Sequence, residues 1–143
     1  MKGMSLIVKK VTQLMAGLVF LYGIYIAVHG HLTPGGGFAG GTIIAGSFIL
    51  LTVANGITVI GLKKEKEQSS HLESLGILAF LCISCGGLLL AAPVFFRNYL
   101  PHGTPGNLLS SGLLPLYNLV VAVEVAAGLL SIFLAFILFK AEE

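Results

Sequence analysis

The chain has 143 residues, of which 56% are hydrophobic and only 10% are charged, and its formal net charge is +2. A soluble domain carries about a quarter of its residues as charged side chains, so this chain has too few charges to cover a surface in water. The composition argues against a soluble enzyme and against a nucleic-acid-binding protein. It indicates instead a membrane protein with a single domain, residues 1–143.

The first uncharged run extends from Val11 to Leu62. As one helix this run would be about 78 Å long, whereas the hydrocarbon layer of a bilayer is about 30 Å thick. The run must therefore fold back, and Pro34 with the glycines that follow it is the natural place for the turn. We predict two membrane-spanning helices here, at 11–29 and 38–62.

Two further segments are apolar and long enough to cross a bilayer. They predict helices at 72–96 and 113–139, and the charged segment 63–71 between the second and third helices is interpreted as a solvated loop. Lipid offers no hydrogen-bond partners to the backbone, and the period-two alternation of a membrane barrel is missing. The predicted fold is therefore all-α, with four transmembrane helices.

Basic residues are distributed unevenly between the two sides of the predicted bundle. Four spans place both termini and the 63–71 segment on one side, and the other side has only Arg97 as a cation. The lysines on the first side are Lys2, Lys9, Lys10, Lys63, Lys64, Lys66 and Lys140. Because cytoplasmic loops carry an excess of Lys and Arg, we expect a multi-pass cell-membrane protein with cytoplasmic termini. A cleaved signal peptide is the alternative for the first span, but its apolar stretch is too long.

The sharpest local pattern lies in the first turn. Its residues are His31, Thr33, Pro34, Gly35, Gly36, Gly37, Phe38, Gly40 and Gly41. The glycine spacing resembles a dinucleotide-binding fingerprint, but that motif needs a preceding strand and a later acid, and neither is expected here. Glycines four residues apart instead predict a helix that packs closely on another backbone. An ion that passes the free amides at the helix start is the alternative.

A shorter pattern occurs twice, as His31-x-Thr33-Pro34-Gly35 and again from His102 to Gly106. It fits either a parallel repeat of two helix hairpins or a chance match. The two histidines lack further metal ligands nearby, so surface histidines are expected and no metal or other cofactor is predicted.

Cys82 and Cys85 form a C-x-x-C pattern inside the third predicted span. Without a second pair they cannot complete a zinc site, and a thiolate in lipid is costly. We interpret them as packing residues.

Glu124 is interpreted as the only acidic residue inside a span. A carboxylate at the bilayer centre costs about 2.5 to 3.5 kcal/mol, so its side chain should face other helices, another subunit or water. Ser131 shares its helical face, and Ser47 lies at a similar depth on the second helix. Glu124, Ser47 and Ser131 are therefore the candidates for a Na⁺ or proton path. A buried carboxyl group that serves assembly is the alternative, and no catalytic residue is predicted.

The stretch from His29 to Gly41 resembles the signature of the B-subunit (MnhB/MrpB-like) family of multisubunit Na⁺/H⁺ antiporters. This family also occurs as a module of membrane-bound hydrogenases and oxidoreductases. The segment 112–118 is similar to the family as well, although many bacterial members have an aspartate where Asn118 stands. That difference leaves Glu124 as the candidate acid. The resemblance implies a small subunit of a complex whose large subunits carry much of the proton path.

The leading hypothesis is thus a subunit of a cation/proton-translocating complex, not an enzyme by itself. Its expected partners are other membrane subunits of a hetero-oligomeric antiporter or hydrogenase, the lipid bilayer, and Na⁺ or protons, with no nucleic acid. Three alternatives remain: a module of a redox-driven pump, a purely structural spacer, and a stand-alone exporter that acts as a homo-oligomer.

Overall fold

The computed structural model describes residues 4–56, 59–90, 94–108 and 110–142. It contains four helices: α1 (Leu6–Val28), α2 (Gly37–Asn55), α3 (Val59–Leu90) and α4 (Leu114–Glu142). Each has a stretch long and apolar enough to cross a membrane. No strand occurs in the described residues, so the predicted all-α fold with four spans is confirmed.

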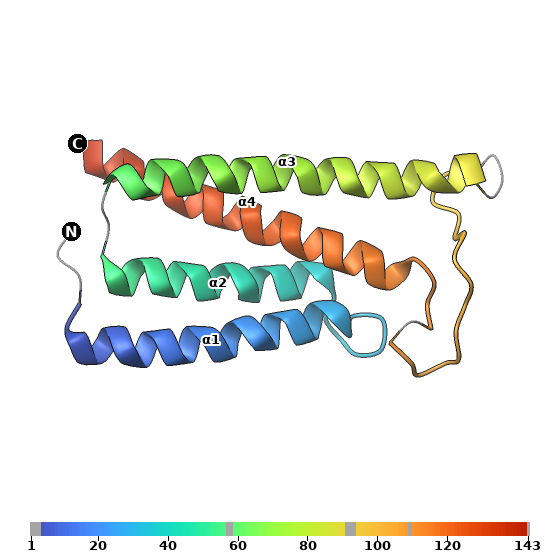
Figure 1. Cartoon of the computed structure of the whole chain (residues 1–143), viewed down its shortest axis with the longest axis horizontal. Helices are drawn as coiled ribbons and strands as arrows, with labels where there is room; N and C mark the ends of the chain where they lie inside the picture. The colour runs from blue at the N-terminus through green and yellow to red at the C-terminus, as the bar shows by residue number, and fades with distance from the viewer. Residues whose placement is uncertain (1–3, 57–58, 91–93, 109, 143) are drawn as a thin grey trace.

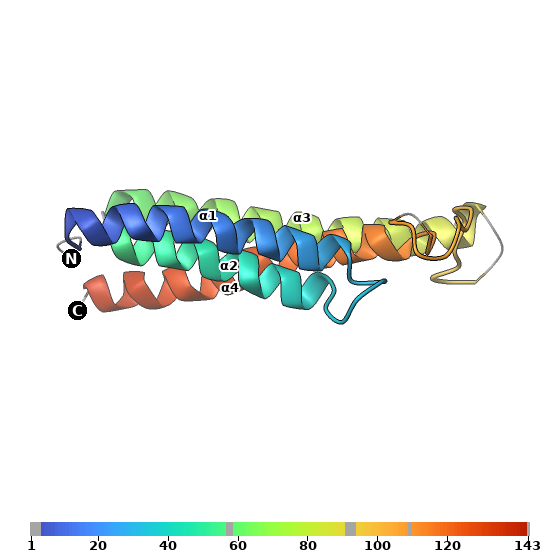
Figure 2. The same cartoon turned by 90° about the horizontal axis from the view of Figure 1, so that it is seen from below.

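The helices lie side by side in the order α1, α2, α4, α3 (Figure 1). Their axes all run along the length of the molecule, as Figure 2 shows from a second direction. Both termini lie at one end, which we call the terminal end, and the α1–α2 turn and the α3–α4 connection lie at the other, the loop end. Within the described residues α3 contacts α4 but neither α1 nor α2. The bundle is therefore two helix hairpins joined along α2 and α4.

Large apolar side chains cover the outside of the bundle. Leu6, Leu89 and Phe136 are each more than two-thirds exposed, whereas many of the buried side chains are those of alanine. Lipid is as apolar as these outer side chains, so membrane helices associate through small residues that allow close backbone packing. The distribution of side chains therefore fits a bundle surrounded by lipid or by other membrane helices.

The turn between α2 and α3 lies earlier than predicted. α2 ends at Asn55, Gly56 follows with a φ of 78°, and α3 begins at Val59. The interpretation of 63–71 as a loop is therefore wrong, because this segment belongs to α3. Lys, Glu and Gln favour helices, and no glycine or proline interrupts the segment. Its charges mark exposure to solvent and not the end of a helix.

The third helix also ends earlier than predicted, at Leu90 and not at 96. Phe96 has a φ of 63°, so the chain has left the helix by that point. The ring of Tyr99 then packs against Gly86, where an added Cβ would lie 2.9 Å from the Tyr99 hydroxyl oxygen. The whole of α3 is thus displaced toward the N-terminus relative to the predicted span, which changes the depth of every residue on it.

The glycines of the first turn bring α2 close to two helices at once. A Cβ added to Gly41 would lie 2.6 Å from the Ala122 carbonyl oxygen on α4. One added to Gly40 would lie 2.7 Å from the Ala27 Cβ on α1. Real Cβ atoms essentially never approach this closely, so both contacts depend on glycine. The stretch that resembles the antiporter signature therefore allows α2 to pack closely on both α1 and α4.

Asn118 of α4 caps the start of α2. The N-cap residue Gly36 has no side chain, and the Asn118 Oδ1 atom accepts a hydrogen bond of 3.4 Å from the Gly37 N–H. The first N–H groups of a helix have no partner within the helix, so this bond satisfies one of them from a neighbouring element.

Replacing Asn118 by Ala should destabilise the α2–α4 contact by about 0.5 to 2 kcal/mol, the usual cost of losing a helix cap. Asn118→Asp keeps an oxygen at the same place, and an anion is favourable at a helix N-terminus. Thermal unfolding of the two variants in detergent checks this. Equal melting temperatures for Asn118→Ala and the unmodified chain would show that the bond contributes nothing.

Candidate functional site

Two glutamates pack against two glycines where α3 and α4 face each other. A Cβ added to Gly76 of α3 would lie 3.0 Å from the Glu124 Cβ of α4. A Cβ added to Gly128 of α4 would lie 3.6 Å from the carboxyl carbon of Glu73 on α3. Each glutamate therefore lies against the glycine of the opposite helix. We call these four residues, Glu73, Gly76, Glu124 and Gly128, the acidic seam.

The acidic seam lies near the middle of the bundle. α3 has 32 residues with Glu73 close to its centre, and Gly128 is the middle residue of the 29 in α4. On α3, Glu73 lies just after the charged segment 63–71, whereas on α4 Glu124 is far from both ends of the candidate span Leu114–Lys140. A carboxylate at this depth costs about 2.5 to 3.5 kcal/mol, and such residues face the protein interior or a water-filled cavity.

The expectation that Glu124 is the only acid in a span is wrong. Glu73 belongs to the candidate span Lys64–Leu89, just after the charged segment at its start, and the sequence-based interpretation did not count it as a residue of that span. A signal was present: Ser69, Glu73 and Gly76 have the spacing i, i+4, i+7, as Glu124, Gly128 and Ser131 do. Two stripes of the same kind on neighbouring helices point to one shared interface.

Glu124 and Ser131 both lie on the face of α4 that meets α3, and both are partly buried. The Ser131 Oγ atom is buried and has no hydrogen-bond partner in the part of the chain that the structure describes. The register set by the acidic seam brings Ser131 level with Ser69 of α3. Two of the three candidates for an ion path thus share one interface, and their role in transport stays a prediction.

Ser47, the third candidate, lies elsewhere. Its side chain is almost fully buried, and its hydroxyl donates a hydrogen bond of 2.7 Å to the Ile44 carbonyl oxygen of its own helix. Ile44 packs on Gly23 of α1, where an added Cβ would lie 2.7 Å from the Ile44 Cγ1 atom. Ser47 is one helical turn from Ile44 and so belongs to the α1–α2 side of the bundle. Ser47 and Glu124 were expected at similar depths on their helices, but their side chains lie at different helix interfaces.

Aromatic side chains close the loop end of the α3–α4 interface. The Tyr117 hydroxyl donates a hydrogen bond of 3.3 Å to the Ser84 Oγ atom. The rings of Phe80 and Phe96 lie 5.2 Å and 6.0 Å from that of Tyr117, and 5.9 Å from each other. These rings fill the interface between the acidic seam and the loop end.

The histidines of the repeated pattern lie in separate contacts at the loop end. His102 is exposed, as predicted for a surface histidine, and its Nε2 atom lies 3.1 Å from the Asn98 side-chain nitrogen. His31 is partly buried, with its Nε2 atom 3.5 Å from the Asn107 carbonyl oxygen and no partner for Nδ1. Within the described ranges no group of three or more metal-binding side chains occurs. Cys82 and Cys85 are free thiols.

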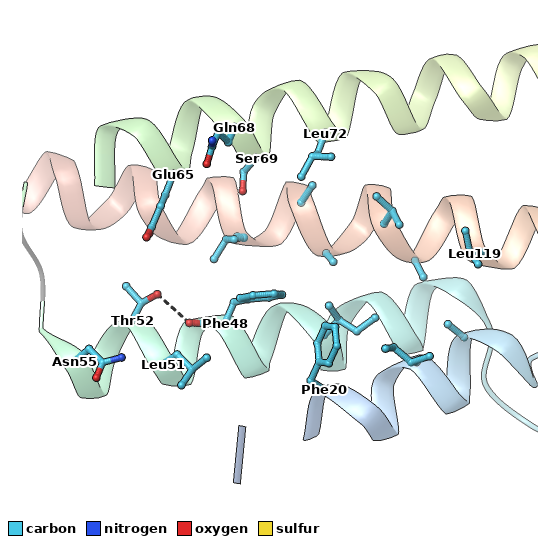
Figure 3. A pocket seen from close by; sticks show the side chains of 18 of the residues that line it. Phe20, Phe48, Leu51, Thr52, Asn55, Glu65, Gln68, Ser69, Leu72 and Leu119 are labelled. Carbon is cyan, nitrogen blue, oxygen red and sulfur yellow. Dashed lines mark hydrogen bonds between the residues drawn. The ribbon is translucent and has the colours of Figure 1, made fainter. Parts of the chain in front are cut away.

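A groove of about 830 Å³ opens between the α1–α2 hairpin and α3, with α4 along it (Figure 3). Its loop-end part is lined by apolar side chains of α1, α2 and α4. Its polar side chains gather at the terminal end and are Thr52 and Asn55 of α2 with Glu65, Gln68 and Ser69 of α3. Ser69 is thus both a groove residue and a member of the α3 stripe that carries Glu73.

The family model described as a domain related to the MnhB subunit of Na⁺/H⁺ antiporters matches residues 7–131. The chain belongs to this family. The resemblance inferred from the glycine-rich turn is therefore confirmed, and the acidic seam lies inside the MnhB-related domain. The chain is accordingly a multi-pass membrane protein.

Relatives of this MnhB-related chain occur in archaea and bacteria. An uncharacterised protein of Methanocaldococcus jannaschii is 33% identical over 128 residues, which are 86% of this chain and 48% of that protein. The putative antiporter subunit mnhB2 of Staphylococcus epidermidis is 29% identical over 75% of this chain and 71% of its own length. The Na⁺/H⁺ antiporter B-subunit of Bacillus subtilis is 32% identical over 61% of this chain and 52% of its own.

A solved structure has the same fold as this MnhB-related chain. A chain of the membrane-bound sulfane sulfur reductase, an archaeal respiratory membrane complex, matches with a TM-score of 0.68 and 27% identity. The match covers 90% of this chain and 56% of that one. The chain thus spans about half the length of the archaeal relative and of this structural neighbour.

Proposed function

We propose that the chain is a small integral-membrane subunit of a multisubunit complex that translocates Na⁺ and protons, and that Glu124 belongs to its proton path. The observation that carries the proposal is the place of the acidic seam: two glutamates lie between α3 and α4, and Glu124 is far from both ends of the candidate span Leu114–Lys140. Ionisable residues at this depth are costly, and they typically mark ion or proton pathways.

Other membrane subunits are the natural partners of this chain. Relatives are described as antiporter subunits, and the structural neighbour belongs to a respiratory membrane complex. We infer that the same module serves either an antiporter or a redox-driven ion pump, and that this chain performs no redox chemistry of its own. A purely structural spacer is the rival function, but it gives no reason for two glutamates in the middle of the bundle.

Purification of the tagged chain from native membranes tests the subunit proposal. We expect it to be recovered with other integral-membrane proteins at a fixed stoichiometry. Recovery only as a self-oligomer would contradict the proposal and favour a stand-alone exporter.

The terminal end is proposed to face the cytoplasm. It holds seven lysines, whereas the loop end has only Arg97 as a cation, and K/R-rich loops remain cytoplasmic. A fluorescent reporter fused to the C-terminus, which fluoresces only in the cytoplasm, should be bright. A dark fusion protein that is expressed and inserted would reverse the assigned orientation.

A further inference from the structure

We infer that the polar end of the groove is a water-filled entrance to the acidic seam, and that Glu73 is the residue that first accepts the proton there. This inference rests on the proposed function and deepens it, because it names a second acid and the side from which protons arrive. It is carried by Ser69, by the closure of the opposite end, and by the position of Glu73.

Ser69 connects the groove with the seam. The residue is only 5% exposed, and it lines the polar end of the groove. Figure 3 shows its side chain pointing from α3 into the groove, on the same side as Glu65. A hydroxyl that lines a groove can hydrogen-bond to ordered water in that groove. The groove is large enough to hold such water at its polar end.

Ser131 supplies an unsatisfied buried hydroxyl next to the seam. Its Oγ atom is buried and unpartnered within the described residues, and the α3–α4 register brings it level with Ser69. Both serines are one helical turn on the terminal side of the pair Glu73 and Gly128, a rise of about 5 to 6 Å. Polar groups of both helices therefore lie within about one helical turn of the first carboxylate.

The two carboxylates follow one another along the interface. Glu73 is level with Gly128, and Glu124 is level with Gly76, about one helical turn nearer the loop end. Gly128 lies beside the Glu73 carboxyl group, and Gly76 lies beside the Cα, Cβ and Cγ atoms of Glu124. Beyond Glu124 the rings of Phe80 and Tyr117 fill the interface. Water thus has access from the terminal end, and Glu73 is the first acid on its way.

The groups in this row suit a proton better than a metal cation. A bound cation needs several oxygen ligands around one point, whereas the oxygens here are spaced along a helix and the backbone carbonyls are used within it. In the transfer, a hydronium ion in the groove gives one proton to the Glu73 carboxylate. Glu73 then passes that proton to the Glu124 carboxylate and is ionised again, so charge and protons balance at each step.

Thiol labelling in the assembled complex tests the entrance. In a background of Cys82→Ser and Cys85→Ser, Ser69→Cys should react with a charged methanethiosulfonate added at the terminal side. Leu78→Cys is the matched control, because Leu78 is exposed on α3 but does not line the groove. Reaction requires the thiolate and hence water, so Ser69→Cys should react at least about tenfold faster. Equal rates, or reaction only from the loop side, would overturn the entrance.

Transport by Glu73→Gln tests the acceptor. Proton uptake by proteoliposomes that contain the complex should fall about a hundredfold, because a positioned proton-transfer group contributes roughly that much. Glu67→Gln is the control, since Glu67 is exposed on α3 and lies outside the groove and the seam. If the complex with Glu73→Gln does not assemble, the labelling rates test the inference instead, because Glu73 is unchanged in the Ser69→Cys variant.

The outcomes separate the two proposals. Full transport by Glu73→Gln with loss in Glu124→Gln would overturn this inference and leave the proposed function standing. Full transport by both variants would overturn this inference and also the proposal that Glu124 belongs to the proton path.

Discussion

Replacing Glu124 by Gln in the assembled complex is expected to reduce Na⁺-coupled proton exchange in proteoliposomes about a hundredfold. Gln has nearly the same shape and preserves the contact with Gly76, but it cannot take up and release a proton. Proton transfer by a positioned side chain typically contributes at least two orders of magnitude to a rate. Assembly of the complex, judged by co-purification, should not change.

The control for this variant is Glu67→Gln, which removes a carboxylate from the exposed first part of α3. It should exchange ions at the rate of the unmodified complex. Full exchange by Glu124→Gln would show that the carboxyl group only fills space between the helices. The spacer hypothesis would then be the better account of the chain.

Replacing Gly41 by Ala should disrupt the contact between α2 and α4. The added methyl group would lie 2.6 Å from a backbone oxygen of Ala122 and 2.9 Å from the Val125 Cβ, and backbone atoms cannot move aside as a flexible side chain can. Overpacking of this kind typically costs about 1 to 3 kcal/mol. Lower thermal stability in detergent and poorer recovery of the complex should follow.

Gly46→Ala is the matched control on the same helix. A Cβ on Gly46 would meet nothing within 4 Å, and Ala favours a helix by about 1 kcal/mol relative to Gly. This variant should be as stable as the unmodified chain or more so. If both alanine variants behaved alike, close packing of α2 on α4 would not be what the glycines provide.

The number of helices and the all-α fold could be predicted because hydropathy and backbone hydrogen bonding leave a membrane chain few choices. The glycine-rich turn was equally predictable, since Pro34 and three consecutive glycines stop any helix. The turn at Gly56 could not be predicted in the same way. It is marked by one glycine inside an apolar run, while the charged segment after it is more conspicuous but helical.

The role of Glu73 was missed for the same reason, because the start of α3 was predicted too late in the chain. A helix that begins at 72 has Glu73 in its first turn, whereas one that begins at Val59 has Glu73 near its middle, where it faces α4. Ser47 illustrates a second limit. Its depth could be estimated by counting residues along its helix, but whether it faces α1 or α4 depends on how α2 is rotated. That rotation is set by the contacts of Gly40 and Gly41 with both neighbours, which the sequence does not specify alone.

The most direct test of this account is the structure of the purified complex in lipid nanodiscs, at a resolution that shows side chains and water. We predict that both seam glutamates lie between α3 and α4, with ordered water connecting Glu73 through Ser69 to the terminal end. Acyl chains against either carboxyl group, with no water or polar side chain beside it, would contradict the proposal that protons pass through this chain.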